Sequence, residues 1–366
     1  MTVLEVLARK QNSSELAETV RHIERVAKQR LDCEKIAYIY AKALVLLIFD
    51  DSGVEKQCAD ELVILHDRWT NNESIDEFYG IGLIILINEE QEKKKEKARR
   101  RMEDLVKQWP NNIKIWEEYS ITIRNQSTYA TIDKLLEYHK KIQKITKKFP
   151  DNTCVAEVYS IILDKLIEQQ FFYPEHIFQT VKELKKLSIN WSNNIEIAHR
   201  YAKSLINLYL HQEKVEERVL TTKWLESLYN KWPSDAYIAE AYCQGMVKLT
   251  DKQDMIEAIK TKNKIQKLAD KWYENETIAT ILADELHELI IFCFAGEEEI
   301  REMIQSLESL SRIWPQSKRI IVLYAHSLKH CIVNKKCGER KKMTQRLREL
   351  SKVWSRSKEI RDICTD

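Results

Sequence analysis

The sequence predicts an all-α protein, an α-solenoid of about eight stacked antiparallel helix pairs that forms a single elongated domain over residues 1–366. A short pattern recurs along the whole chain at intervals of about 40 residues, which is typical of stacked helical repeats. Apolar residues around each copy follow helical spacing. The 366 residues include only 6 glycines and 5 prolines, which suits a chain that is helical almost throughout.

Each copy of the pattern centres on a residue, usually aromatic, that ends a helix. In the clearest copy Leu225, Leu228 and Trp232 share one helical face, Pro233 breaks the helix, and a second apolar stripe begins at Ile238. The anchors equivalent to Trp232 are Arg30, Trp69, Trp109, Phe149, Trp191, Trp272, Trp314 and Trp354. One helix pair cannot cover both stripes by itself, so neighbouring pairs are expected to stack.

Two positions after each anchor specify how the helices pack. The tenth residue is tyrosine in seven copies, and Leu282 and Cys364 replace it in the other two. The eleventh residue is small or nearly so: Ala41, Gly80, Ser120, Ser160, Ala202, Cys243, Ala283, Ala325 and Thr365. The small residue is expected to let two helices approach closely beside the tyrosine. Buried tyrosine and tryptophan side chains need hydrogen-bond partners for their polar tips, and truncating a buried anchor tryptophan should cost ~3–5 kcal/mol.

Apolar stripes between turn signals predict the individual helices in order. Residues 1–13 are expected to form a lead or cap, and 89–101 an exposed, highly charged helix supported by pairs such as Glu96 and Arg100. Residues 355–366 begin another first helix, a truncated final repeat that ends as a cap or docking surface. The other expected helices cover 16–28, 34–49, 56–68, 73–88, 113–126, 131–147, 153–169, 174–189, 195–211, 213–230, 236–250, 252–270, 276–293, 297–312, 318–333 and 340–353.

The pattern resembles the tetratricopeptide repeat. The small residues after each tyrosine match the small site in that family's first helix, and Pro110, Pro150, Pro233 and Pro315 match the proline that follows its second helix. The resemblance covers nearly the whole chain, although the period is about six residues longer than the family's period of 34. It implies a right-handed α-solenoid, a superhelix whose first helices line a concave groove that holds peptides.

Composition and charge narrow the class of protein. The formal net charge is +2 with 32% charged residues, so nothing in the overall balance favours nucleic acid or an anionic membrane. The longest apolar runs, Ala43–Phe49 and Ile81–Ile87, are too short to span a bilayer, and residues 1–16 lack the apolar core of a secretory signal. Eight scattered cysteines without a CxxC pair predict buried free thiols in a cytoplasmic protein.

No catalytic motif is recognisable. The phosphate-loop patterns GxxxxGK[ST] and GxGxxG and the patterns HExxH and GxSxG are all absent from the sequence, so we expect neither an enzyme nor a cofactor. The best metal candidate is His326, His330, Cys331 and Cys337, with the two histidines on one helical face. Because this segment lies inside a repeat, with Cys331 at an apolar stripe position, a packing role is favoured and no metal site is predicted.

The resemblance also implies which residues face the groove. Carrying the family's inner positions over gives a ligand-binding set of Lys42, Arg124, Asn125, Lys165, Lys203, Asn207, Gln244, Lys248, His287 and His326. Lys165, Lys203, Asn207 and Lys248, from consecutive repeats, are candidates to grip a carboxylate or an acidic segment. The alternative is an ordinary polar inner surface, since polar residues are the default on any exposed face.

The function expected is that of a non-catalytic protein- or peptide-binding scaffold or adaptor. One alternative is a nucleic-acid-binding protein that uses the basic tracts Lys93–Arg101, His139–Lys148 and Lys335–Arg348, and whose affinity would fall steeply with salt. Another is a regulatory or sensor subunit of a separately encoded enzyme. No membrane partner is expected, and the sequence does not separate the scaffold from the regulatory subunit.

Overall fold

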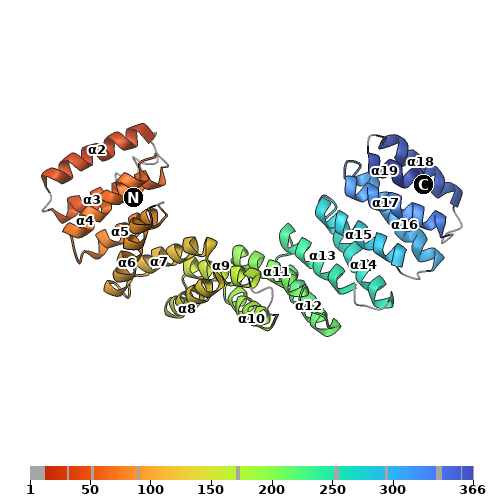
Figure 1. Cartoon of the computed structure of the whole chain (residues 1–366), viewed down its shortest axis with the longest axis horizontal. Helices are drawn as coiled ribbons and strands as arrows, with labels where there is room; N and C mark the ends of the chain where they lie inside the picture. Colours follow the sequence, from red (N-terminus) through yellow and green to blue (C-terminus); the bar gives the residue numbers. More distant parts are fainter. Residues whose placement is uncertain are drawn as a thin grey trace. The chain divides into compact units, whose positions relative to one another are not determined.

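A computed structural model describes residues 13–30, 33–50, 53–88, 91–169, 174–250, 255–292, 296–334, 340–355 and 357–365. These residues form α-helices, one short 3-10 helix and the turns between them, which confirms the predicted all-α helical-repeat fold (Figure 1). The helices are α2 (Ser13–Gln29), α3 (Glu34–Phe49), α4 (Glu55–Arg68), α5 (Glu73–Ile87), α6 (Glu92–Gln108), α7 (Ile113–Gln126), η1 (Ser127–Tyr129), α8 (Ile132–Lys148), α9 (Thr153–Gln169), α10 (Pro174–Asn190), α11 (Ile195–Tyr209), α12 (Val215–Lys231), α13 (Ala236–Thr250), α14 (Met255–Lys271), α15 (Glu276–Phe292), α16 (Glu297–Ile313), α17 (Lys318–Val333), α18 (Arg340–Val353) and α19 (Lys358–Thr365).

The helix bounds agree with the sequence prediction to within a few residues, except that α6 continues to Gln108, seven residues beyond the predicted helix over 89–101. The predicted start of another first helix after residue 355 is observed as α19, which packs on α17 and α18. The predicted lead over residues 1–13 lies outside the described residues except for Ser13, the first residue of α2. No helix within the described ranges combines the length and apolar character needed to cross a lipid bilayer.

Every anchor forms the same tight turn between a second helix and the next first helix. The Trp69 N–H donates to the Leu65 carbonyl at 2.8 Å, and the N–H of Asn72 donates back to the Trp69 carbonyl at 3.2 Å. The bonds recur at Trp109 and Trp314. The anchor is therefore the C-cap of one helix, and the residue three positions later is the N-cap of the next.

The N-cap of this turn is usually an asparagine, a regularity that the sequence analysis did not identify. Its side-chain oxygen accepts a hydrogen bond from the backbone N–H three residues on, as an N-cap should. This bond is made by Asn72, Asn112, Asn152, Asn194, Asp235 and Asn275 at 2.9–3.2 Å. It fixes the start of each first helix.

The same caps also connect neighbouring repeats. The amide nitrogen of Asn112 donates to Glu77 at 2.9 Å, that of Asn152 to Glu117 at 2.6 Å, and that of Asn275 to Glu240 at 2.9 Å. The acceptor glutamate lies eight residues after the preceding anchor in each case. These glutamates therefore hold the array together, which gives them a structural role.

We expect Asn112→Ala to lower the free energy of unfolding by ~0.5–2 kcal/mol, because an N-cap is lost and two glutamates lose their donor. Asn112 also donates to Glu73 at 2.9 Å. Urea unfolding measures the change. Asn111→Ala, in the same turn and exposed, is the control and should change stability by only a few tenths of a kcal/mol. Equal effects of the two substitutions would contradict the role of the cap.

The helices group into two compact units, Met1–Gln170 and Phe171–Asp366. In the first unit, α3, α5, α7 and α9 pack successively on one another, and each is flanked by a second helix of the array. In the second unit, α11, α13, α15, α17 and α19 do the same. The prediction of one elongated domain over residues 1–366 stays a prediction.

Close helix packing depends on the small residues that follow each tyrosine. Ala41, Ser120, Ala202 and Ala283 are fully buried, as their position in the repeat predicts. The tyrosines of the repeat are buried too, among them Tyr40, Tyr79 and Tyr201. The prediction that the anchor tryptophans are buried is wrong. They lie half-buried at the helix ends, so their truncation should cost less than removal of a core side chain.

Candidate functional site

The ten residues predicted for the groove all lie on first helices of the repeats. Lys42, Arg124, Asn125 and Lys165 belong to the first unit; Lys203, Asn207, Gln244, Lys248, His287 and His326 belong to the second. Each side chain is half-buried or exposed. This placement is compatible with the expected polar surface, and a ligand role for these residues stays a prediction.

The predicted cluster of Lys165, Lys203, Asn207 and Lys248 is divided between the two units. Lys165 lies on α9 in the first unit, where its Nζ donates to the Ser127 hydroxyl at 3.1 Å and burial lowers its pKa. Lys203 and Asn207 lie one turn apart on α11, and Lys248 lies on α13, which packs on α11. A carboxylate grip by these residues stays a prediction.

Histidines gather on the first helices at the end of the second unit. The rings of His287 and His326 are 6.1 Å apart, and His287 Nδ1 is 2.9 Å from the Ser327 hydroxyl. Burial and the neighbouring His326 lower the pKa of His287 to about 4. No group of three potential metal ligands occurs among the described residues, and Cys337 of the metal candidate lies outside them.

The lowered pKa of His287 predicts a pH-dependent stability. Between pH 6.5 and about 4 the unfolded chain binds a proton that the folded chain does not, so the free energy of unfolding should decrease as pH falls through this window. Urea unfolding at several pH values should show a shallower slope in His287→Gln than in the wild type. His211→Gln, in the turn after α11, is the control. Identical slopes in the wild type and in His287→Gln would contradict a neutral, half-buried His287.

Some bases of the predicted basic tracts are paired with carboxylates within the described residues. Arg100 lies 3.2 Å from Glu96, which confirms that predicted pair, and Arg99 contacts Glu92 and Glu96 at 3.4 Å. In the second tract, Lys141 contacts Glu103 and Glu137. The third tract is described only from residue 340 onward. Such pairing leaves less positive charge for a phosphate backbone than the sequence suggests.

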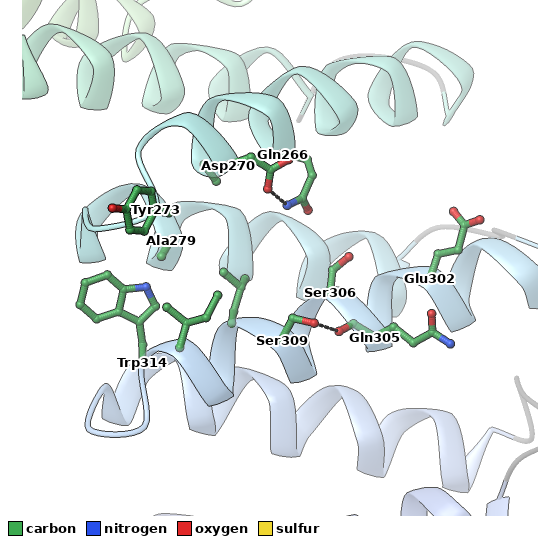
Figure 2. Close-up of a pocket in the computed structure, with 12 residues that line it drawn as sticks. Gln266, Asp270, Tyr273, Ala279, Glu302, Gln305, Ser306, Ser309 and Trp314 are labelled. Atoms are coloured by element: carbon green, nitrogen blue, oxygen red, sulfur yellow. Dashed lines mark hydrogen bonds between the residues drawn. The ribbon is translucent and has the colours of Figure 1, made fainter. Parts of the chain in front are cut away.

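A cavity lies in the second unit, between the second helices α14 and α16 (Figure 2). Its volume is about 510 Å³, within the ~300–1,000 Å³ that is usual for ligand sites. Tyr273, from the turn after α14, and Trp314, from the end of α16, lie at one end, and Glu302 lies at the other (Figure 2). The remaining lining residues are Gln266, Ala269, Asp270, Ala279, Gln305, Ser306, Ser309, Leu310 and Ile313.

The cavity occurs where the chain departs from its repeat. In three other copies the tyrosine of a first helix forms a hydrogen bond with a long side chain eight residues before the next anchor. Tyr40 donates to Glu61, Arg101 donates to Tyr79, and Arg346 donates to Tyr324, each at 3.3 Å. In the seventh copy both members differ, because Leu282 replaces the tyrosine and Ser306 replaces its partner. Neither residue can form this link.

The first unit contains an equivalent site in which both the tyrosine and its long-side-chain partner are present. There Lys141 of α8 lies beside Tyr119, whose pKa is raised by burial and partly lowered again by the lysine. Lys141 also pairs with Glu103 of α6 at 3.2 Å. These side chains line a smaller space of about 160 Å³. The sequence already contained the signal for the larger cavity, in the coupled loss of tyrosine at 282 and of a long side chain at 306.

A second surface feature lies on α10 and α12 of the second unit. The rings of Phe178 and Trp224 stack with centroids 6.4 Å apart. Lys182 Nζ lies 4.3 Å from the centroid of Phe178, and Lys185 Nζ lies 4.1 Å from that of Trp224. Burial lowers the pKa of Lys185. We call these four residues the lysine–aromatic patch, which was not among the predicted basic tracts.

Comparison of the sequence with known protein families and with curated proteins gives no match. The function is therefore argued from the fold, the cavity and the surface alone.

Proposed function

We propose that this chain is a non-catalytic scaffold that binds a protein or peptide partner. The observation that carries the proposal is the cavity between α14 and α16. It opens where the link between neighbouring repeats is missing, and it combines aromatic, polar and acidic side chains. Helical repeats offer large binding surfaces and carry no catalytic chemistry of their own. A repeat that departs from the common pattern has a surface unlike that of its neighbours, and such a surface can bind a partner selectively.

A photo-crosslinking amino acid at Gln305, on the rim of the cavity, tests the proposal. Gln345 is the matched control, because it occupies the same repeat position on α18 and is also exposed. In the source cell we expect a discrete protein adduct from position 305 that survives nuclease, and none from position 345. Adducts of equal pattern at both positions, or no protein adduct at 305, would refute binding at this site.

We further propose that the repeat is a divergent form of the tetratricopeptide repeat and that the protein is cytoplasmic. The buried small residues beside each tyrosine support the first statement. Free cysteines support the second: Cys58 and Cys243 are buried, and burial raises the pKa of Cys58 to about 11. Such thiols suit a reducing compartment. We propose the groove residues predicted from the resemblance as a further contact surface. The partner that the scaffold binds could be an enzyme that it regulates.

A second candidate function is binding of single-stranded nucleic acid, and the lysine–aromatic patch favours it. Aromatic rings with interleaved cations suit bases and phosphates. The test is binding of a fluorescein-labelled oligonucleotide, measured by anisotropy at increasing salt. Binding that weakens steeply with salt and is lost in Lys182→Ala would support this function. Binding unchanged in Lys182→Ala would exclude the patch as the site.

A further inference from the structure

We propose that the cavity between α14 and α16 receives an arginine or lysine side chain of the partner protein. The inference rests on the proposed function and names the chemistry of the group that the site would hold. Two carboxylates, Asp270 and Glu302, are among the lining residues, and no basic residue is. A buried or half-buried cation entering this space would find opposite charge and no repulsion from the walls.

The repeat itself shows a cation in the equivalent position. In the first unit Arg101, eight residues before its anchor, reaches back to Asp67, two residues before the preceding anchor, at 3.3 Å. Ser306 occupies the repeat position of Arg101, and Asp270 occupies that of Asp67. Compared with the Arg101–Asp67 pair, the cavity has the acid, Asp270, without the base. The cavity lies where the missing side chain would be.

A lysine or arginine stands at this position in four copies, Arg101, Lys141, Lys264 and Arg346, whereas Glu61, Glu183 and Trp224 occupy it in three others. Lys141 pairs with Glu103, and Arg346 pairs with Glu308, each across neighbouring second helices. Both acids lie six residues before the preceding anchor, where the cavity has Gln266. Gln266 donates to one oxygen of Asp270, Oδ1, at 2.9 Å and so orients the carboxylate (Figure 2).

The aromatic end of the cavity suits the same ligand. Tyr273 takes the place of the proline that follows four other anchors, and it is 64% exposed. Its ring and that of Trp314 lie at one end of the cavity (Figure 2). The faces of aromatic rings attract guanidinium and ammonium groups, and they also cover the aliphatic stem of an arginine or lysine.

The test uses defined probes on the purified full chain, with dissociation constants from saturation-transfer difference NMR. The probes are the capped tripeptide Gly-Arg-Gly, the same peptide with neutral citrulline, and free ethylguanidinium. We expect the arginine peptide to bind about tenfold more tightly than either other probe, and about tenfold more weakly to Asp270→Asn than to the wild type. Glu216→Gln, an exposed acid on α12, should bind as the wild type does.

Filling the cavity from within gives the sharper comparison. Ser306→Arg supplies a base of the kind that Arg101 and Arg346 provide at this position in other copies, and it should abolish binding of the arginine peptide. Ser227→Arg adds the same charge on an exposed face of α12 and should leave binding unchanged. Circular dichroism verifies that both variants fold.

Three results would overturn the inference: no binding of the arginine peptide, equal binding of the citrulline peptide, or unchanged binding in Ser306→Arg. Ethylguanidinium that binds as tightly as the arginine peptide would overturn the assignment to a protein side chain. These outcomes are distinct from failure of the proposed function. A protein adduct at position 305 without selectivity for the arginine peptide would support the scaffold function and refute the cation site. Binding of the arginine peptide without a protein adduct would support the cation site and refute the scaffold function.

Discussion

Asp76→Ala is expected to lower the free energy of unfolding of the first unit by ~3–5 kcal/mol, since a fully buried, hydrogen-bonded carboxylate is removed from its partners. Asp76 Oδ1 lies 2.5 Å from His66 Nδ1, and Oδ2 accepts from the Trp109 indole at 2.7 Å. Gln108 lies 3.4 Å from the same oxygen. The substitution would leave an imidazole and an indole N–H facing a space without an acceptor.

Urea unfolding and hydrogen exchange of α4 to α7 measure this effect. Exchange is the more informative readout, because a repeat array can unfold locally without unfolding as a whole. Asp60→Ala, an exposed acid on α4, is the control and should lie within ~0.5 kcal/mol of the wild type. If Asp76→Ala and Asp60→Ala have the same free energy of unfolding, the buried hydrogen-bond network around Asp76 contributes little to stability.

Leu225→Ala is expected to cost the second unit ~2–5 kcal/mol, because Leu225 is fully buried between α12 and α13. Opposite it lies Gly245, where an added Cβ would come 2.5 Å from Leu225 Cδ1 and 3.1 Å from the Tyr209 hydroxyl. That hydroxyl is itself 2.7 Å from the Thr222 hydroxyl. Gly245→Ala alone should therefore cost ~1–3 kcal/mol through overpacking.

The double variant provides the stricter test. Leu225→Ala removes the methyl group that the new Cβ of Gly245→Ala would contact. The double variant should therefore lose less stability than the sum of the losses in the two single variants. Gly80→Ala is the matched control: an added Cβ there meets Glu118 Cγ at 3.4 Å, an ordinary contact, and the change should be neutral or stabilising by up to ~1 kcal/mol. Strict additivity of Leu225→Ala and Gly245→Ala would show that the two residues do not share one packing site.

The sequence was sufficient to predict the helices because their signal is local and repeated. Each apolar stripe, each anchor and each small residue recurs about every 40 residues, so nine copies support one interpretation. The burial of Tyr79 and Ala41 followed from the same pattern. The half-buried anchor tryptophans did not, because a residue at a helix end lies at the edge of the core, whatever its hydrophobicity.

The candidate site was less accessible from the sequence. Asn112 and Glu77 are separated by 35 residues, and only the stacking of repeats shows that they form a hydrogen bond. The basic residue Arg99 stands in a run of bases, yet its carboxylate neighbours lie on the same helix face. Spacing alone does not reveal which charges are neutralised, because pairing depends on rotamers and on neighbouring helices.

By itself the sequence determined the all-α repeat, the helix bounds and the positions of the small packing residues, because these depend on periodicity and on local turn chemistry. Only the tertiary structure decided that Asp76 is buried among three hydrogen-bonding side chains, that His287 is half-buried beside His326, and that a cavity opens beside Ser306. Those features need residues from different helices in one place. Their free energies come from desolvation and contact across the stack, which a linear pattern does not contain.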